Sequence, residues 1–182
     1  MKFIKNDIND LLVIEPNIFG DQRGWFSESY NQDVFMKNGL DFVFVQDNHS
    51  FSAQKGVLRG LHFQNNPNAQ TKLVRCTKGS IWDVAVDLRK SSSTYLKWFG
   101  IELSAENHLM LLVPQGFAHG FVTLEDNCEV QYKVDKTYDK LSNRSIKYDD
   151  PQIGINWPVI NVFLSDKDIN AKLLKDSDVN FI

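Results

Sequence analysis

The chain has 182 residues, of which 42% are hydrophobic and 24% charged, and its formal net charge at pH 7 is −3. The apolar fraction is sufficient for a globular core, and the acidic balance argues against nucleic acid as the main partner, because binding phosphates in bulk needs a basic excess. No apolar run is long enough for a signal peptide or a membrane span, so we expect a cytoplasmic protein with no membrane partner.

The organisation of the chain is that of a single unit. No repeat, low-complexity tract or linker interrupts it, and we expect one domain over residues 1–182. The two cysteines, Cys76 and Cys128, offer no disulfide framework, and we expect two buried thiols in a reducing compartment.

Strand patterns dominate the chain. The first, at 42–50, alternates apolar and polar residues, and three longer stretches each read as two strands joined by a turn. Those stretches are 71–89 with a turn at Lys78–Ser80, 98–114 with a turn at Ser104–Asn107, and 120–135 with a turn at Glu125–Asn127. Their recurrence at about 8–12 residues predicts an all-β sandwich or barrel.

Helical signals occur in two places. The stretch 31–40 offers Asn31 as an N-cap and Gly39 near the C-terminal cap, and in 165–176 Ser165 is followed three residues later by Asp168, as in a capping box. We therefore predict an all-β fold of the cupin type, a jelly-roll barrel with a few short helices that encloses a small-molecule cavity.

The stretch "GVLRGLHFQ" tests whether such a barrel would hold a metal. Metal-binding cupins present a glycine, then a histidine after five residues, a second histidine two residues on, and a glutamate. Gly56 and His62 keep this spacing, but Gln64 stands at the second imidazole and Asn68 or Ala69 at the carboxylate. The second cupin signature, Pro-x-Gly-x-x-His, is present as Pro114, Gly116 and His119. Two imidazoles are too few for a transition-metal site, and we predict no metal.

Without a metal, His62 is either a core histidine bonded to a backbone carbonyl or a catalytic group. Strand alternation puts it on one face with Leu58, Gly60 and Gln64, and puts Arg59 opposite unless a bulge intervenes. Lys72 follows in the next strand and Tyr132 comes from a later one. A histidine, a lysine and a tyrosine on barrel strands suggest acid–base chemistry at a carbonyl, with a base, an acid and a cation for a developing oxyanion.

A family resemblance makes this interpretation specific. The motifs that carry it are "FGDQRGWFSESYN", "VQDNHSFSAQKGVLRGLHFQ", "AQTKLVRCTKGSIWDVAVDLR", "ELSAENHLMLLVPQGFAHGFVTL", "YDDPQIGINWP" and "LSDKD". Together they cover nearly the whole chain, which resembles the dTDP-4-dehydrorhamnose 3,5-epimerase family. The resemblance implies a cupin-like jelly roll, a homodimer whose members exchange N-terminal strands, and no metal or organic cofactor. It implies a dTDP-sugar substrate, dTDP-4-keto-6-deoxyglucose, inverted at carbons 3 and 5 on the route to dTDP-L-rhamnose.

The resemblance also implies roles for individual residues. His62 is the base, held by Asp168; Lys72 faces the enolate; and Tyr132 is the acid on the opposite face of the sugar. The capping box gives Asp168 a competing role, and we expect only one of the two to be filled, with the His62 pairing favoured. Further residues match positions that contact substrate: Arg23, Glu28, Gln46, Asn48, Arg59, His119 and Lys167, together with Tyr138, which matches the residue on which thymine stacks.

One segment departs from the family pattern. Where the family commonly carries Pro-x-x-Glu-Gly-Gly, this chain reads "DKLSNRSIKY", so Asn143 replaces a carboxylate that contacts substrate and Arg144 replaces a glycine. This leaves open which nucleotide sugar is preferred, and relatives that invert only carbon 3 share most of the motifs. Two other classes remain as alternatives: a metal-dependent cupin enzyme, disfavoured by Gln64 and Asn68, and a sugar-binding jelly roll without catalysis.

Overall fold

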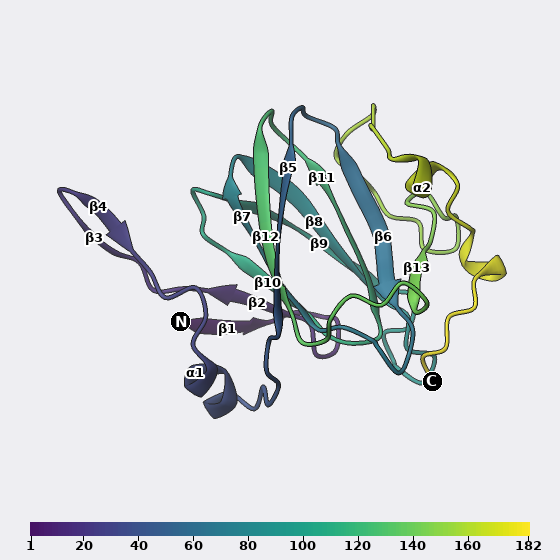
Figure 1. Ribbon diagram of the computed structural model, residues 1–182, viewed down its shortest axis with the longest axis horizontal. Coiled ribbons are helices and arrows are strands. Elements are labelled where there is room, and N and C mark those ends of the chain that lie inside the picture. Colours follow the sequence, from purple (N-terminus) through teal and green to yellow (C-terminus); the bar gives the residue numbers. More distant parts are fainter.

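Two antiparallel sheets form the body of the protein in the computed structural model, which describes residues 1–182 (Figure 1). The first sheet has the strand order β1 (Lys2–Lys5), β2 (Leu12–Glu15), β10 (Met110–Val113), β7 (Lys72–Lys78), β12 (Cys128–Val134) and β5 (Gln46–Ser52). The second has the order β13 (Asn143–Ser145), β6 (Leu58–Gln64), β11 (Phe117–Thr123), β8 (Ser80–Asp87) and β9 (Trp98–Ser104). The predicted all-β jelly roll is confirmed.

Three of the connections between strands cross from one sheet to the other. The turns at Lys78–Ser80, Ser104–Asn107 and Glu125–Asn127 do separate strands, but β7 and β8, β9 and β10, and β11 and β12 each lie in different sheets. Gly79 has a φ of +71°, and a Cβ on it would lie 2.7 Å from the Cys128 sulfur. A tight reversal packed against Cys128 thus carries the chain from one sheet to the other.

Apolar side chains from both sheets fill the space between them. The largest buried cluster includes Val74 and Val130 from the first sheet and Ile81 and Phe121 from the second. A second cluster lies where the C-terminal segment, through residues such as Phe181, packs on Phe63 and its neighbours in the second sheet. The two cysteines are free and buried. No helix is both long enough and apolar enough to cross a membrane.

The helices are short. Helix α1 (Gln32–Lys37) begins after its N-cap Asn31, whose side chain accepts a hydrogen bond from the Val34 amide, as predicted, and Gly39 follows it with a φ of +79°. Helix α2 (Asp166–Ile169) begins after Ser165 but ends within four residues, and a separate 3₁₀ turn, η1 (Leu174–Asp176), follows. The predicted helical stretch 165–176 is therefore divided into a one-turn α-helix and a 3₁₀ turn.

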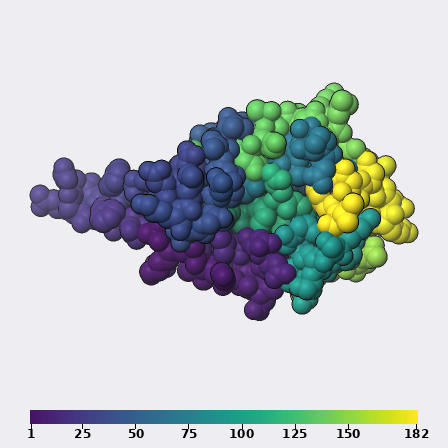
Figure 2. Space-filling model, turned by 90° about the horizontal axis from the view of Figure 1, so that it is seen from below, coloured from purple at the N-terminus to yellow at the C-terminus, as the bar shows by residue number.

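An arm projects from the body. Strands β3 (Phe19–Asp21) and β4 (Gly24–Phe26) pair only with each other, and Figures 1 and 2 show this hairpin extending away from both sheets. Its large apolar side chains are mostly exposed: Phe19 by 61%, Trp25 by 60% and Phe26 by 66%. Such a row of exposed aromatic groups is a typical sign of a contact surface for another chain.

Candidate active site

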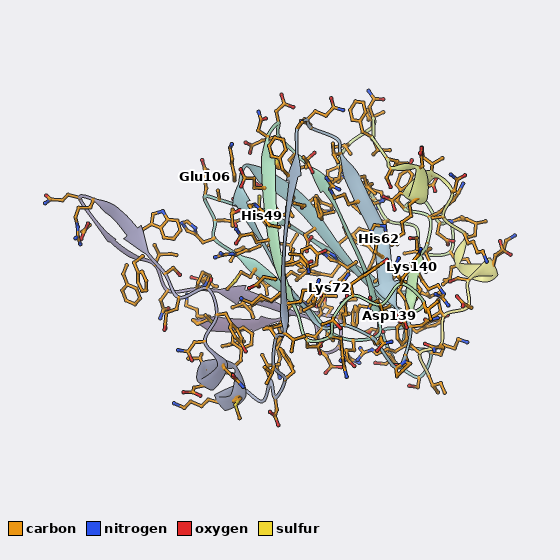
Figure 3. All side chains as sticks on the ribbon, viewed as in Figure 1. His49, His62, Lys72, Glu106, Asp139 and Lys140 are labelled. Atoms are coloured by element: carbon orange, nitrogen blue, oxygen red, sulfur yellow. The ribbon has the colours of Figure 1, made fainter.

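A cavity of about 340 Å³ opens between the two sheets and gathers most of the residues predicted from the sequence. Figure 3 shows His62 and Lys72 within the body of the molecule. The cavity lining includes eleven predicted residues, namely Gln46, Asn48, Arg59, His62, Lys72, His119, Tyr132, Tyr138, Asn143, Lys167 and Asp168. The remaining two, Arg23 and Glu28, lie elsewhere.

A bulge in β6 explains how Arg59 and His62 both reach the cavity. His119 pairs with His62, but Phe121 pairs with Arg59, so β6 carries one residue more than β11 between these pairs. The strands approach so closely here that a Cβ on Gly60, whose φ is +143°, would lie 2.5 Å from the Gly120 Cα. The exception expected in the case of a bulge therefore applies, because the extra residue of the bulge re-aims the Arg59 side chain toward the cavity.

His62 is paired with a buried carboxylate. Its Nε2 lies 2.5 Å from Oδ1 of Asp168, which is 3% exposed. Burial lowers the pKa of His62 below its usual value, although Asp168 opposes this shift. Burial would raise the pKa of Asp168, but the hydrogen bond and charge of His62 outweigh it and lower that pKa. The ionised carboxylate can only accept, so the ring carries its proton on Nε2 and leaves Nδ1 as the basic nitrogen.

Asp168 also belongs to the cap of helix α2. Its backbone amide donates to the Ser165 hydroxyl oxygen at 3.3 Å, and that hydroxyl donates to Oδ2 of Asp168 at 2.9 Å. Oδ1 remains directed at His62. The expectation that only one of the two roles can be filled is wrong, because a carboxylate has two oxygens and each takes a different partner. The cap thus fixes the carboxylate that orients the histidine.

Lys72 provides a buried cation next to His62. Its side chain is 8% exposed, and its Nζ donates a 3.5 Å hydrogen bond to the His62 carbonyl oxygen. Burial lowers the pKa of Lys72 to about 8, a shift that Asp83 opposes and Lys167 increases. At neutral pH Lys72 is therefore a charged ammonium group, and its side chain forms no ion pair with a carboxylate. It can interact strongly with any negative charge placed near it.

Tyr132 enters the cavity from β12, in the sheet opposite to that of His62. Burial raises the pKa of its phenol, although the charge of Arg59 opposes the rise. The group is therefore protonated at neutral pH and can donate. Arg59 in turn is held by hydrogen bonds to the Phe51 carbonyl and the Ser52 hydroxyl.

A second histidine–carboxylate pair was not foreseen. His119, 6% exposed, has its Nε2 2.9 Å from Oδ1 of Asp83, which is completely buried. Oδ2 of Asp83 has no hydrogen-bond partner. The signal in the sequence was a charged residue within the apolar run "SIWDVAVD", since a buried carboxylate needs a specific partner.

The opposite end of the cavity is built around a loop. Gln46 and Asn48 on β5 are joined by a 2.9 Å hydrogen bond, and Gln46 also accepts one from the Tyr138 amide. The Tyr138 ring is 59% exposed. Asn143, on β13, also lines the cavity, and so does Lys167, which precedes Asp168 on α2 and whose charge acts on both His62 and Lys72. Arg144 beside Asn143 forms a two-pronged ion pair with Asp178 and does not line the cavity.

Arg23 and Glu28 are outside this cavity. Arg23 lies at the tip of the arm, where it pairs with Asp21, and Glu28 is exposed and accepts a hydrogen bond from Asn31. Within one chain they therefore do not join the other predicted contacts. A sequence motif alone does not distinguish a contact made within one chain from a contact made by a second copy.

The chemistry available in the cavity is proton transfer. It combines a neutral imidazole, a phenol and an ammonium group, whereas no cluster of three or more His, Cys, Asp or Glu side chains is arranged to hold a metal ion. Gln64 contributes an amide where a second metal-binding imidazole would stand. This set of groups suits removal and return of a proton next to a carbonyl group.

Comparisons with known proteins all match nearly the full length of the chain, and they all point to one family. A family model described as dTDP-4-dehydrorhamnose 3,5-epimerase matches residues 5–176. The chain is 55% identical over 179 residues to dTDP-4-dehydrorhamnose 3,5-epimerase from Shigella flexneri, covering 98% of each chain.

Two solved structures are similar throughout. The enzyme of the same name from Bacillus anthracis, crystallised with TDP and PPi, has a TM-score of 0.93 and 50% identity, covering 95% of this chain and 99% of that one. The 3,5-epimerase from Legionella pneumophila in complex with dTDP-4-keto-L-rhamnose has a TM-score of 0.93 and 46% identity, covering 97% and 94%. The family model, matched at residues 5–176, spans all the residues that line the cavity.

Proposed function

The chain belongs to the dTDP-4-dehydrorhamnose 3,5-epimerase family and has the activity of that family, and we propose that His62, Tyr132 and Lys72 carry out the reaction. The substrate is dTDP-4-keto-6-deoxy-D-glucose and the product dTDP-4-keto-L-rhamnose, on the route to dTDP-L-rhamnose. The observation that carries this proposal is that His62 and Tyr132 project into one cavity from opposite sheets.

Inversion requires groups on both faces of the sugar ring. Carbons 3 and 5 flank the ketone at carbon 4, so a base that removes either proton leaves an enolate with its charge on the ketone oxygen. A single base would return the proton to the face from which it came. A ring bound between β6 and β12 has His62 on one face and the Tyr132 phenol on the other, which is the arrangement that inversion needs.

His62 takes the proton at Nδ1. Its Nε2–H remains bonded to Asp168, so the imidazolium formed by proton transfer is stabilised by the carboxylate. Tyr132 then delivers its hydroxyl proton to the opposite face, and solvent returns the two groups to their starting protonation states. Two such cycles, one at each carbon, give the product.

Lys72 stabilises the enolate. An ammonium group in a shielded cavity interacts with an oxyanion much more strongly than it would in water. Its burial beside His62 puts it near the base without adding a competing acceptor.

The remaining lining residues bind the nucleotide. Arg59 and Lys167 supply positive charge for the diphosphate, and a guanidinium group is suited to paired hydrogen bonds with phosphate oxygens. Tyr138 offers its exposed ring face to thymine. The polar contacts come from Gln46, Asn48, His119 and Asn143.

Arg23 and Glu28 act across a homodimer. Neither residue lines the cavity of its own chain, since Arg23 is on the arm and Glu28 follows it. The arm projects from the body (Figure 2), and three of its aromatic side chains are exposed. Exchange of the N-terminal segments in a two-fold dimer would bury these aromatic groups and bring Arg23 to the partner's cavity.

The reaction needs no metal and no organic cofactor, since the base, the acid and the oxyanion stabiliser are all side chains. We also infer a cytoplasmic location, in keeping with two free, buried cysteines.

Exchange of ring protons with deuterated water tests the proposal. The protein is incubated with dTDP-4-keto-6-deoxyglucose in D₂O, and the proton signals at carbons 3 and 5 are followed by NMR. We expect both signals to disappear as the product forms. Loss of the carbon 3 signal alone would identify a 3-epimerase, and retention of both would refute the proposed reaction.

A further inference from the structure

Gln64 occupies a prominent position for which the reaction gives it no role. It lies on β6 two residues after His62, lines the same cavity and is only 3% exposed. It also stands where a metal-binding barrel would place a second imidazole. A buried polar side chain at such a place needs its hydrogen bonds satisfied, and the identity of its partners indicates what it does.

All the partners of the Gln64 amide are backbone groups. Its Nε2 donates to the carbonyl oxygens of Asn68, at 2.7 Å, and Thr137, at 3.3 Å, and its Oε1 accepts from the Asp139 amide at 2.7 Å. Backbone donors and acceptors fix the orientation of the amide, because the reversed orientation would set like groups against each other. Both N–H groups are thus committed, and neither is free for a ligand.

These hydrogen bonds hold the residues on either side of Tyr138. The segment 135–142 connects β12 of the first sheet with β13 of the second (Figure 1), and Asp139 is labelled beside β6 in Figure 3. Gln64 fixes the carbonyl of Thr137 and the amide of Asp139, while Gln46 accepts from the amide of Tyr138 itself. Two glutamines from opposite sheets therefore hold three consecutive residues.

The Tyr138 ring has little else to fix its position. It is 59% exposed, and it takes part in no contact with another aromatic ring and in no cation–π contact. Its placement at the cavity is therefore set mainly by the backbone that carries it. Without the hydrogen bonds that hold that backbone, the ring would be free to occupy several positions. Ligand binding would then cost the entropy of ordering the ring.

We propose that Gln64 is a positioning residue for the nucleobase end of the substrate, acting through the backbone of the 137–139 segment on Tyr138. This rests on the proposed function, in which Tyr138 is the surface on which thymine stacks. The position that serves metal binding in other barrels here serves nucleotide recognition. Its effect is on affinity, and the proton-transfer groups are untouched.

Binding of two probes separates this role from general stabilisation. We compare Q64L, Y138A and the double variant with the wild type, using dTDP and inorganic pyrophosphate as ligands in calorimetry. Q152L is the matched control, since it makes the same change at an exposed glutamine whose side chain has no hydrogen bond. We expect Q64L to weaken dTDP binding about tenfold and to leave pyrophosphate binding unchanged, and Q152L to resemble the wild type.

Kinetics and the double variant complete the test. In Q64L, KM should rise by the same factor as the dTDP dissociation constant, with kcat within about twofold of the wild type. In the Y138A background the same substitution should change dTDP affinity less than about twofold, because the group it positions is gone. An equal loss in both backgrounds, an equal loss of pyrophosphate affinity, or a lower kcat at unchanged KM would each overturn the proposal.

A second variant guards against a folding defect in Q64L. Q64E keeps the shape of the side chain but directs a carboxylate at two carbonyl oxygens, so it should show the same dTDP defect at neutral pH. Protonation of the introduced carboxyl restores one donor, and the defect relative to wild type should shrink as the pH falls. A pH-independent defect in Q64E would count against a role for the hydrogen bonds that Gln64 makes to the backbone.

Unchanged dTDP affinity in Y138A, with normal epimerase activity, would refute the assignment of Tyr138 as the thymine-stacking residue. It would also refute the role of Gln64, whereas the proton-transfer mechanism would stand.

Discussion

The imidazole of His62 and the carboxylate of Asp168 lie 2.5 Å apart although 106 residues separate them in the chain. The second oxygen of the carboxylate accepts from Ser165, so the cap of a one-turn helix holds the partner of the base. The C-terminal segment that packs on the second sheet thus also completes the site. Its contribution can be measured separately from that of the barrel strands.

Asp168→Asn should lower kcat by about two to four orders of magnitude. The amide cannot stabilise the imidazolium, and it can present its NH₂ group to Nε2 and so favour the wrong tautomer. Because Asp168 opposes the lowering of the His62 pKa, that pKa should fall further in the variant, as an NMR titration of the ring would show. Asp166→Asn, on the same helix but exposed, is the control and should behave as wild type. A His62 pKa that stays unchanged in Asp168→Asn would contradict the pairing.

The pH dependence of kcat/KM should be bell-shaped. Activity is lost on the acid side as His62 takes up a proton, with a midpoint below pH 6.5 because its pKa is lowered in the folded protein. On the alkaline side the ammonium of Lys72 is lost near pH 8, which removes the charge that stabilises the enolate.

Lys72→Arg isolates the alkaline limb. A guanidinium group stays charged throughout this range, so the fall near pH 8 should vanish even where the altered geometry lowers the rate. Lys78→Arg, at an exposed lysine, should keep the wild-type profile. An alkaline limb that survives in Lys72→Arg would assign it to another group.

Asn143→Glu tests whether this chain prefers the usual substrate. Asn143 lines the cavity, and the neighbouring Arg144 is neutralised by Asp178, so the introduced carboxylate would meet the substrate with no new cation beside it. If dTDP-4-keto-6-deoxyglucose is the preferred substrate, kcat/KM of the variant should stay within about tenfold of the wild-type value. This corresponds to a change in activation free energy of at most roughly 1.4 kcal/mol. We would compare several dTDP-sugars on both proteins. A large gain on one of them would indicate a different native preference, and identical preferences would remove any role of Asn143 in specificity.

That His62, Lys72 and Tyr132 line one cavity could be predicted from the sequence, because they lie on strands with clear patterns. Two features depend on the whole barrel rather than on the local pattern. The strands joined by the three predicted turns lie in opposite sheets, since pairing is decided by burial across the whole barrel rather than by the turn between them. Arg59 faces the cavity because the approach of Gly60 to Gly120 accompanies an extra residue in β6.

Other features had no local signal. Asp83 looks like one charge in an apolar strand until His119 is found beside it, and the two roles of Asp168 become compatible only when the direction of each oxygen is known. Arg23 was predicted to contact the substrate from the family resemblance alone. In the structure of one chain it lies at the tip of the arm, away from the cavity of that chain.

The arm should complete the site of a partner subunit. We expect sedimentation at micromolar concentration to give the mass of a dimer. Arg23→Ala and His62→Ala should each lower activity strongly, the first in the arm and the second in the cavity. In a mixed dimer, the chain with Arg23→Ala keeps an intact cavity and receives an intact arm, so co-refolding the two variants should restore up to about one quarter of the wild-type activity, assuming random pairing. A monomeric mass, or no recovery in verified mixed dimers, would exclude an arm acting in trans.

The separate roles of His62 and Tyr132 are visible in isotope exchange. If His62 removes the protons, His62→Ala should abolish deuterium uptake at carbons 3 and 5, because no enolate forms without a base. Both ring signals in the NMR spectrum should then persist for the whole incubation. Continued exchange at both carbons in this variant would require another base, and Lys72 and His119 are the nearest candidates in the cavity lining.

Tyr132→Phe should give the complementary result. The substitution keeps the ring and removes only the hydroxyl, so His62 still forms the enolate but the opposite face lacks its acid. Deuterium should enter with retention of configuration, and epimer formation should fall much further than exchange does. This requires solvent to reach the proton on His62, whose side chain is 29% exposed, and a longer incubation controls for slow exchange. Epimerisation by Tyr132→Phe at the wild-type rate would mean that the proton on the far face comes from a group other than this phenol.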